Sequence, residues 1–300
     1  GGWDRKRIPL KPRAVPVEGE AMYVTTFEKA GSKVRLDEIS TAPPKGVSRE
    51  EAEKKFGDLG DELFELQELL WGARTHSVLV ILQGRDSAGK DGVIKHVVGC
   101  LNPRGVEVVS FGVPTREESE HDFLWRVHRH TPRKGEFSIF NRSHYEDVLV
   151  VRVHNLVEKS IWGERYGHIA DFEELLMEHN TIVLKYFLHI SKGEQEKRLK
   201  EREVDRRTAW KLTANDWKER ERWDEYTEAY EEAISRTSRE RAPWTIVPAD
   251  AKWFRNLAIA HSIVEALRPH RKTWQEKLDA DGAKAKAELE AYRRERSLGK

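Results

Sequence analysis

The chain has 300 residues, of which 38% are hydrophobic and 35% are charged, and its mean hydropathy is −0.73. Its 53 basic and 52 acidic side chains leave a net charge of +1, which excludes steering to nucleic acid or membrane by a global field. Ten Trp, ten Phe and seven Tyr argue against a disordered chain, because disordered sequences are poor in aromatic residues.

The first fifty residues predict an extended arm, since they are rich in proline and show no sustained periodicity. A helix follows, because Ser48 and Glu51 have the spacing of a capping box and the leucines between Leu59 and Leu70 recur on one helical face. Beyond this helix, short apolar runs alternate with helical patterns. The expected strands cover 78–82, 106–111, 137–140, 182–190 and 244–247. The expected helices cover 90–100, 117–130, 146–158, 168–180, 191–236 and 251–268.

Strands separated by helices predict right-handed crossovers and an α/β fold with a parallel sheet covered on both faces. Residues 194–236 contain no strand pattern and are too many for one crossover helix, so we expect a helical hairpin that projects from the sheet as a lid. Residues 271–300 predict a charged helix on the surface or at an oligomer contact. The expected organisation is therefore an arm at 1–50, one domain at 51–270 and this terminal helix.

Directly after the first of these strands stands Gly-Arg-Asp-Ser-Ala-Gly-Lys-Asp-Gly at 84–92, which contains the Gly-x4-Gly-Lys core of a P-loop. Glycines let the backbone fold around a phosphate with its N–H groups pointing inward, and the next helix presents its N-terminus to the same anion. Lys90 adds a mobile positive charge. The position between a buried strand and a helix favours phosphate binding over the alternative, a glycine turn with a surface lysine. The predicted phosphate contacts are Gly84, Arg85, Ala88, Gly89, Lys90, Asp91 and Gly92.

Two acids distinguish this loop from an ordinary P-loop. Asp91 stands where Ser or Thr usually ligates Mg²⁺. Asp86 lies inside the loop, where a carboxylate beside phosphates is explained if it holds Mg²⁺ that bridges phosphate oxygens. The alternative for Asp86 is a turn aspartate that bonds its own backbone.

A second polar motif, Asn-Arg-Ser-His-Tyr-Glu-Asp at 141–147, follows the third expected strand, at the carboxyl edge of the sheet where α/β sites lie. Asn141 is neutral where a P-loop enzyme needs a carboxylate, and Glu146 and Asp147 supply acids one turn later. Arg142 is placed to neutralise phosphate charge. The alternative for the two acids is stabilisation of a first helical turn through its dipole.

The expected lid mixes ten basic and eight acidic residues over 194–222. A solvated helix is the default interpretation of such a run, but Arg and Lys interleaved with Trp suit a surface that closes on a polyanion. The basic and aromatic side chains are Arg202, Arg206, Arg207, Trp210, Lys211, Lys218, Arg222 and Trp223.

Together these motifs resemble the polyphosphate kinase 2 family over residues 50–270. The stretch 84–92 resembles its variant Walker A motif, 141–148 its Walker B region, 202–211 its lid and 242–250 its late strand. The resemblance implies a P-loop three-layer α/β/α sandwich with a helical lid. It also implies reversible, Mg²⁺-dependent phosphoryl transfer between inorganic polyphosphate and nucleotides.

The resemblance further implies roles for single residues. Asp86 would help bind Mg²⁺ and activate the accepting phosphate, and Lys90 would contact the transferring phosphoryl group. Arg142 would hold polyphosphate or product phosphate, while Arg202 and Lys211 would reach in from the lid. The expected catalytic residues are Asp86, Lys90, Arg142 and Asp147. The expected nucleotide contacts are Asn141, His144, Glu146 and Asp147. The expected metal ligands are Asp86, Glu146 and Asp147.

Asn141 departs from family members that have Asp there, which leaves open which acid replaces it. The motif around it, together with Lys-Asp-Gly after Ala-Gly, resembles the subgroup that phosphorylates both AMP and ADP. The expected partners are inorganic polyphosphate, AMP, ADP and ATP, with GMP and GDP as further acceptors. The expected cofactor is Mg²⁺, with Mn²⁺ as an alternative, and the family suggests a homodimer or homotetramer.

Two other functions remain open at this stage. An ATP-dependent nucleoside monophosphate or small-molecule kinase is one, although such enzymes grip ATP through the Ser or Thr that this loop lacks. A non-catalytic P-loop binding module is the other. A covalent phosphohistidine intermediate at His144 is a further alternative, but the P-loop arrangement favours direct in-line transfer, which needs no such intermediate.

The cysteine content and the length of the apolar runs indicate the cellular compartment. The single cysteine, Cys100, excludes an intramolecular disulfide and a cysteine-rich zinc site, and we expect it in a helix core. No apolar run reaches the length of a membrane span, and the first residues lack a signal-peptide stretch. We therefore expect a cytoplasmic protein with no nucleic-acid or membrane partner.

Overall fold

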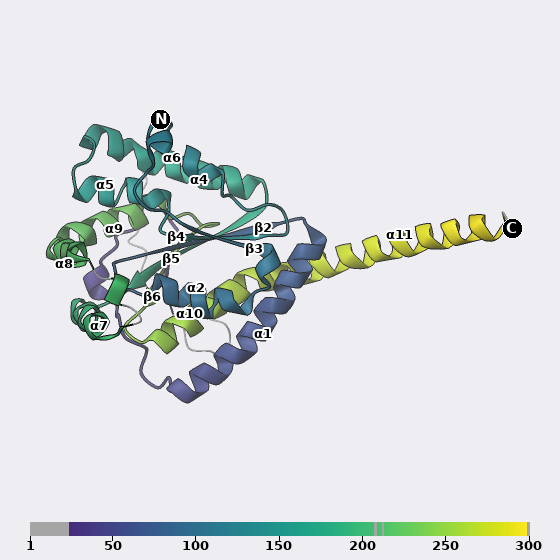
Figure 1. Ribbon diagram of the computed structural model, residues 1–300, viewed down its shortest axis with the longest axis horizontal. Helices are drawn as coiled ribbons and strands as arrows, with labels where there is room; N and C mark the ends of the chain where they lie inside the picture. The colour runs from purple at the N-terminus through teal and green to yellow at the C-terminus, as the bar shows by residue number, and fades with distance from the viewer. Residues whose placement is uncertain (1–23, 207–208, 212, 299–300) are drawn as a thin grey trace, which may run out of the picture.

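A computed structural model of the chain describes residues 24–206, 209–211 and 213–298. Its core is a six-stranded sheet in the order β1-β6-β5-β2-β4-β3. Strands β2 to β6 are parallel, and β1 pairs antiparallel with β6 (Figure 1). The strands are β1 (Thr25–Phe27), β2 (Ser77–Gly84), β3 (Val106–Ser110), β4 (Phe137–Asn141), β5 (Thr181–His189) and β6 (Trp244–Pro248).

Helices cover both faces of the sheet, which confirms the expected α/β sandwich (Figure 1). The helices are α1 (Arg49–Ala73), α2 (Lys90–His96), α3 (Arg116–Ser119), α4 (Trp125–His128), α5 (Val150–Val153), α6 (Lys159–Glu178), α7 (Lys192–Val204), α8 (Ala214–Glu221), α9 (Trp223–Thr237), α10 (Lys252–Leu267) and α11 (Arg271–Leu298). Short 3-10 turns are η1 (Leu36–Glu38), η2 (Val98–Cys100), η3 (Pro103–Gly105), η4 (His144–Asp147), η5 (Ala209–Lys211) and η6 (Arg268–His270).

The central strand β2 shows why helices are needed on both faces of the sheet. All eight of its residues are buried, and their side chains alternate between the faces, as the period of two requires. Val80 and Leu82 pack with α1, α2 and α10, whereas Leu79 and Ile81 pack with α5, α6 and α9. Two hydrophobic cores therefore fix the carboxyl end of β2, from which the P-loop emerges.

The expected strands all occur, but several other segments differ from expectation. The arm contributes β1, which is too short to show a sequence pattern and which forms because it can pair with the open edge of β6. The helix expected at 117–130 is two single turns, α3 and α4, because Asp122 accepts a hydrogen bond from the N–H of Leu124 and starts a new turn. The helix expected at 146–158 is replaced by η4 and α5.

The segment expected as one projecting hairpin at 194–236 divides into two parts. Helices α7 and α8 lie beside the P-loop, but α9 buries Ala229, Tyr230, Ala233 and Ile234 in the core that α5 and α6 also form against the sheet. Tertiary burial therefore makes α9 part of the sandwich.

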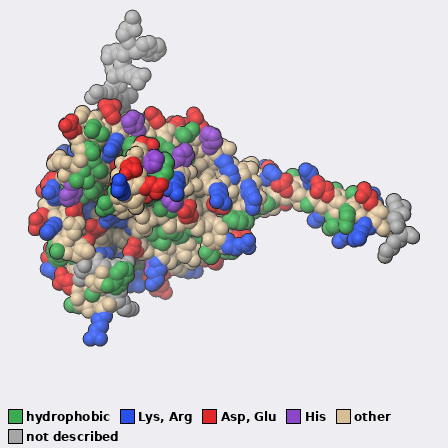
Figure 2. Space-filling model, turned by 45° about the horizontal axis from the view of Figure 1, so that its top comes forward, with side chains coloured by type: hydrophobic (Ala, Val, Ile, Leu, Met, Phe, Trp, Pro, Cys, Tyr) green, Lys and Arg blue, Asp and Glu red, His purple; other side chains and the backbone are tan. Residues whose placement is uncertain are grey.

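Helix α11 extends far from the sandwich (Figure 1). Trp274, in its first turn, is buried, while its second half is exposed. Acidic and basic side chains alternate along this helix and over the visible face of the body, in agreement with the near-zero net charge (Figure 2). No helix within the described ranges is long and apolar enough to cross a membrane.

Candidate active site

The P-loop joins the buried end of β2 to the start of α2. Its backbone takes positive φ angles at Gly84 (153°), Ser87 (66°) and Gly89 (107°), which fold the chain tightly between the two elements. A Cβ atom at Gly89 would lie 1.8 Å from the guanidinium of Arg255, so only glycine fits there. The expected turn between strand and helix is thus present, and it is packed from outside by a buried arginine.

Lys90 lies in the first turn of α2 with its ammonium group inside the loop. Its Nζ donates hydrogen bonds to the carbonyl oxygens of Gly84 (2.7 Å) and Arg85 (3.3 Å). Burial lowers the pKa of Lys90, while the nearby Asp86 carboxylate acts in the opposite direction. The cation is therefore held at the position where a phosphate in the loop would meet it.

Asp86 and Arg142 bring the two sequence motifs into contact. The guanidinium of Arg142 donates to Asp86 Oδ1 at 2.7 Å, although the residues are 56 positions apart. Arg142 has a φ of 62°, which is unusual for a residue with a side chain and is typical of strain at functional sites. The carboxyl end of β4 thus aims a positive charge at the P-loop acid.

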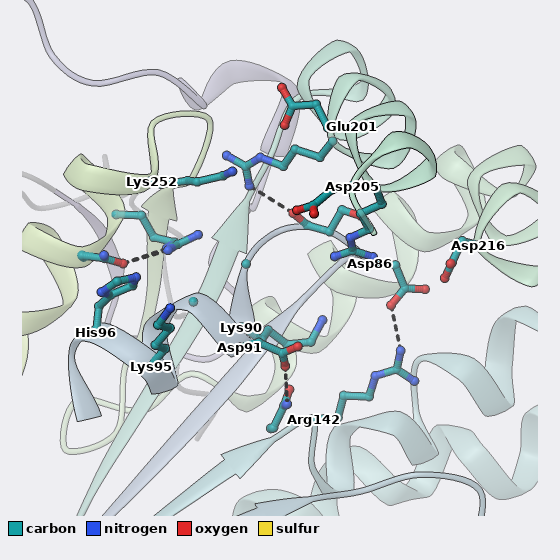
Figure 3. Close-up of a pocket in the computed structure, with 18 residues that line it drawn as sticks. Asp86, Lys90, Asp91, Lys95, His96, Arg142, Glu201, Asp205, Asp216 and Lys252 are labelled. Atoms are coloured by element: carbon teal, nitrogen blue, oxygen red, sulfur yellow. Dashed lines mark hydrogen bonds and ion pairs between the residues drawn. The ribbon is translucent and has the colours of Figure 1, made fainter. Parts of the chain in front are cut away.

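Two cavities open on either side of this ion pair. The first, called here the P-loop cavity, has a volume of about 700 Å³ and is bounded by the P-loop, α2, α7 and α10 (Figure 3). Its charged lining residues are Asp86, Lys90, Asp91, Lys95, Arg142, Arg198, Glu201, Arg202, Asp205, Asp216, Lys252 and Arg255. Basic side chains therefore reach it from the loop, from α7 and from α10.

The second cavity, called here the aromatic cavity, has a volume of about 200 Å³ and lies between the P-loop, α8 and α9. Its lining includes the rings of Trp223, Tyr226 and Tyr230 and the carboxylate of Glu146. Burial raises the pKa of Glu146, and the positive charges of Arg142 and Lys90 partly offset this effect. Asp86 and Arg142 line both cavities, so the ion pair is their common wall.

The predicted phosphate contacts divide between the cavities. Those in the P-loop cavity are Gly89, Lys90, Asp91, Gly92, Arg142 and Arg202. Gly84 and Arg85 line the aromatic cavity, where the Arg85 guanidinium stacks 3.8 Å from the centre of the Trp223 ring. Burial lowers the pKa of Arg85 to about 10. The side chain of Ala88 is buried and lines neither cavity. Arg207 and the side chain of Lys211 lie outside the described residues.

Besides Ala88, two of the predicted site residues, His144 and Asp147, do not line either cavity. His144 is fully buried, and its Nε2 lies 3.3 Å from Glu173 in the core. Asp147 forms an ion pair with Arg165 at 2.9 Å and lies 3.9 Å from Arg126. The geometry of η4 explains this placement, because its tight turn points successive side chains in different directions, and of its residues Glu146 lines the aromatic cavity.

Sequence reasoning missed two buried arginines that support the P-loop. All three nitrogens of Arg198 donate, to Glu194 and to four backbone carbonyls in the P-loop and the loop after β6. Arg255 lies against Gly89 and Gly92, and its hydrogen bonds go to Asn256 and to the Ala88 carbonyl. The sequences of α7 and α10 have ordinary helical patterns that do not indicate this role. One feature could have pointed to it, namely that Arg255 interrupts the otherwise apolar face of α10.

The donor set fits a magnesium ion that is completed by substrate oxygens. Within the described ranges no group of three or more His, Cys, Asp and Glu side chains could hold a metal by itself. Mg²⁺ is usually bound by one or two carboxylates together with phosphate oxygens and water. Asp86 and Asp91 both line the P-loop cavity beside Lys90, and they meet this requirement (Figure 3).

Comparison with known proteins places this geometry in a family. The family model described as polyphosphate kinase 2 matches residues 46–275, which is most of the chain. The chain belongs to the polyphosphate kinase 2 family. It is 50% identical over 233 residues to an AMP/ADP-polyphosphate phosphotransferase of Meiothermus ruber, an alignment that covers 78% of this chain and 87% of that protein.

Two further relatives support the assignment. An ADP-polyphosphate phosphotransferase of Rhodopseudomonas palustris is 40% identical over 259 residues, covering 82% of this chain and 90% of that protein. The crystal structure of polyphosphate kinase 2 from Arthrobacter aurescens superposes with a TM-score of 0.76 at 40% identity, covering 80% of this chain and 87% of that one. The expected P-loop kinase fold is therefore confirmed along most of the chain.

Proposed function

We propose that this member of the polyphosphate kinase 2 family transfers phosphoryl groups reversibly between inorganic polyphosphate and adenine nucleotides. The observation that carries the proposal is the common wall of the two cavities, since Asp86 and Arg142 line both. A phosphoryl group that passes between a donor in one cavity and an acceptor in the other must cross this wall. Family membership and the names of the relatives support the same chemistry.

The shapes of the cavities suggest which substrate each one takes. The larger P-loop cavity has basic groups from three elements, which suits a flexible polyanion. The aromatic cavity offers rings on which a base can stack and is close in size to a small ligand. We assign polyphosphate to the P-loop cavity and the nucleotide to the aromatic cavity, with Glu146 on the nucleotide side.

The reaction then needs alignment and charge neutralisation rather than a covalent intermediate. A phosphate oxygen of the nucleotide attacks the terminal phosphorus of polyphosphate, and the bond to the rest of the polymer breaks, which shortens it by one unit. Lys90, Arg142 and Arg202 spread the negative charge that develops. The bound metal would neutralise phosphate oxygens, and Asp86 would hold it. Transfer through His144 is disfavoured, because that ring lies in the core.

The lid is assigned to α7 and α8, a narrower segment than 194–236. Arg202 of α7 and Asp216 of α8 line the P-loop cavity, while Asn215 and Arg220 of α8 line the aromatic cavity. Movement of this pair of helices would close both cavities together. Closure would exclude water, so that transfer competes with hydrolysis.

Several finer properties belong to the same proposal. AMP and ADP are both acceptors, as in the name of the Meiothermus ruber relative, ATP is the final product, and GMP and GDP are further acceptors. Mg²⁺ is the working metal, and Mn²⁺ can replace it. The protein acts in the cytoplasm, which suits a chain with a single cysteine. It forms a homodimer or homotetramer, with α11 as a candidate contact.

The role of Asp86 can be tested by replacing it with asparagine, which keeps an acceptor for Arg142 and removes the charge. We expect Asp86→Asn to lower the rate of ATP formation from ADP and polyphosphate by about 10- to 100-fold, because the charge that orients metal and acceptor is lost. A luminescence assay for ATP measures this rate. Asp171→Asn, on the exposed face of α6, is the control and should keep the original rate. A folded Asp86→Asn protein with full activity would remove Asp86 from the mechanism.

A further inference from the structure

The residue after the P-loop lysine and the last residue of β4 form a hydrogen-bonded pair. Asn141 Nδ2 donates to Asp91 Oδ1 at 3.1 Å. The contact follows from the topology, because β4 pairs with β2 in parallel and Asn141 lies beside Leu82, just before the loop that leads to α2. The two residues therefore meet at the edge of the P-loop cavity.

In an ordinary P-loop enzyme these two positions have the opposite chemistry. The residue after the lysine is a neutral Ser or Thr, the strand carries an Asp, and both act on the same Mg²⁺. Here the helix carries the acid and the strand carries the neutral side chain. The pair as a whole keeps one carboxylate and one neutral polar group, with their places exchanged.

The exchange explains why Asn141 is neutral. An aspartate at 141 would place a second carboxylate against Asp91, and two like charges at hydrogen-bonding distance repel each other. The asparagine amide donates a hydrogen bond instead and fixes the orientation of the Asp91 carboxylate. A hydrogen-bonded neighbour that orients a ligand in this way commonly affects metal affinity.

The other candidates for the missing strand acid are less well placed. Asp147 is engaged by Arg165 and Arg126 and lines neither cavity. Glu146 lines only the aromatic cavity. Asp91 lines the P-loop cavity together with Asp86, and the two acids flank Lys90 in the sequence and at the cavity wall (Figure 3).

We infer that Asp91 replaces the absent strand carboxylate as a ligand of the metal, and that Asn141 is the positioning residue that orients it. This inference rests on the proposed phosphoryl transfer, because the metal shell includes oxygens of the phosphate chain. It assigns the Asp91 carboxylate to the metal and leaves the phosphate contacts to Lys90 and the loop backbone.

The test measures metal binding without turnover. Mn²⁺ is titrated into the full chain with inorganic tripolyphosphate and no nucleotide, and the electron paramagnetic resonance signal of free Mn²⁺, corrected by the same titration of tripolyphosphate without protein, gives the dissociation constant. Asp91→Asn keeps an acceptor for Asn141 but loses the charge, and we expect it to raise this constant by about tenfold or more. Asp147→Asn is the matched control, with an expected change of no more than about twofold because Asp147 lines neither cavity.

A second variant separates a ligand from a merely structural residue. Asp91→Ser alone should bind Mn²⁺ weakly, whereas Asp91→Ser combined with Asn141→Asp returns the carboxylate to the strand. We expect the combined variant to bind within about threefold of the unaltered protein, a non-additive recovery that only a shared ligand role explains. Circular dichroism confirms folding, and if one variant does not fold, the other decides.

Two results would overturn the inference. One is an Asp91→Asn protein whose Mn²⁺ affinity equals that of the unaltered protein, and the other is a combined variant as weak as Asp91→Ser. Failure of the proposed function is a different result, because the unaltered protein would then make no ATP from ADP and polyphosphate, whatever its variants do in the Mn²⁺ titration.

Discussion

Replacement of Lys90 by alanine is expected to lower the rate of polyphosphate-dependent ATP formation by about 10²- to 10³-fold, the usual cost of removing one preorganised charge-stabilising group. The Lys90 ammonium is buried and is held by two carbonyl oxygens of its own loop, so it is already in place before substrate binds. Arg142, the basic neighbour from β4, is already paired with Asp86 and so is held away from the position that Lys90 occupies. The loss should appear in kcat at saturating polyphosphate.

Lys95→Ala is the matched control for this prediction. Lys95 lines the same cavity one turn further along α2, but it is exposed and lies away from the loop carbonyls. Its removal should change the rate only a few-fold, about the value of an exposed charge contact. A Lys90→Ala protein that remains folded and keeps more than about a tenth of the original kcat would contradict the role given to Lys90.

Replacement of Lys185 by methionine is expected to lower the free energy of unfolding by about 3–5 kcal/mol, because it leaves a charge buried without its partner. Lys185 lies in β5, and its Nζ donates to Glu173 Oε2 at 2.6 Å and to the Thr237 carbonyl at 2.8 Å. Tyr145 also donates to Glu173, at 2.8 Å. Lys185 and Glu173 are at most 1% exposed, so water cannot replace the lost partner.

Chemical denaturation with two controls measures this effect. Lys197→Met removes an exposed lysine that pairs with Glu194 and Glu201, and it should cost less than about 1 kcal/mol. Lys185→Met combined with Glu173→Leu removes both charges and should recover much of the loss, as replacement of buried pairs by apolar residues often does. A loss below about 1 kcal/mol for Lys185→Met alone would show that the pair adds little to stability.

The same network contains a contact that could not be predicted from the sequence. Lys185 is a charge inside the apolar run that predicted β5, and a buried charge needs a partner. That partner, Glu173, lies on α6, and no local pattern connects the two residues. His144 and Tyr145 complete the network, so two residues of the motif at 141–147 hold η4 against the core.

Local sequence patterns were sufficient to predict the parallel strands of the sheet and the P-loop. Continuous apolar runs predicted the five parallel strands, and a glycine-rich turn between strand and helix predicted the anion site. They could not assign α9, whose charges suggested a solvated lid although its apolar face, with Tyr230 and Ile234, is buried. The sequence also could not show where each side chain points. Glu146 and Asp147 are adjacent in sequence, yet Glu146 faces the aromatic cavity and Asp147 faces Arg165.

We propose that phosphoryl groups cross the wall formed by Asp86 and Arg142, from polyphosphate to a nucleotide. The most direct test supplies the purified, unaltered protein with Mg²⁺, ADP and long-chain polyphosphate as the sole donor, and measures ATP; parallel reactions contain AMP as acceptor or ATP as donor. We expect ATP to form from ADP, and ADP followed by ATP to form from AMP, only when polyphosphate is present. Phosphorylation of AMP by ATP with none from polyphosphate, or nucleotide binding without any turnover, would contradict it.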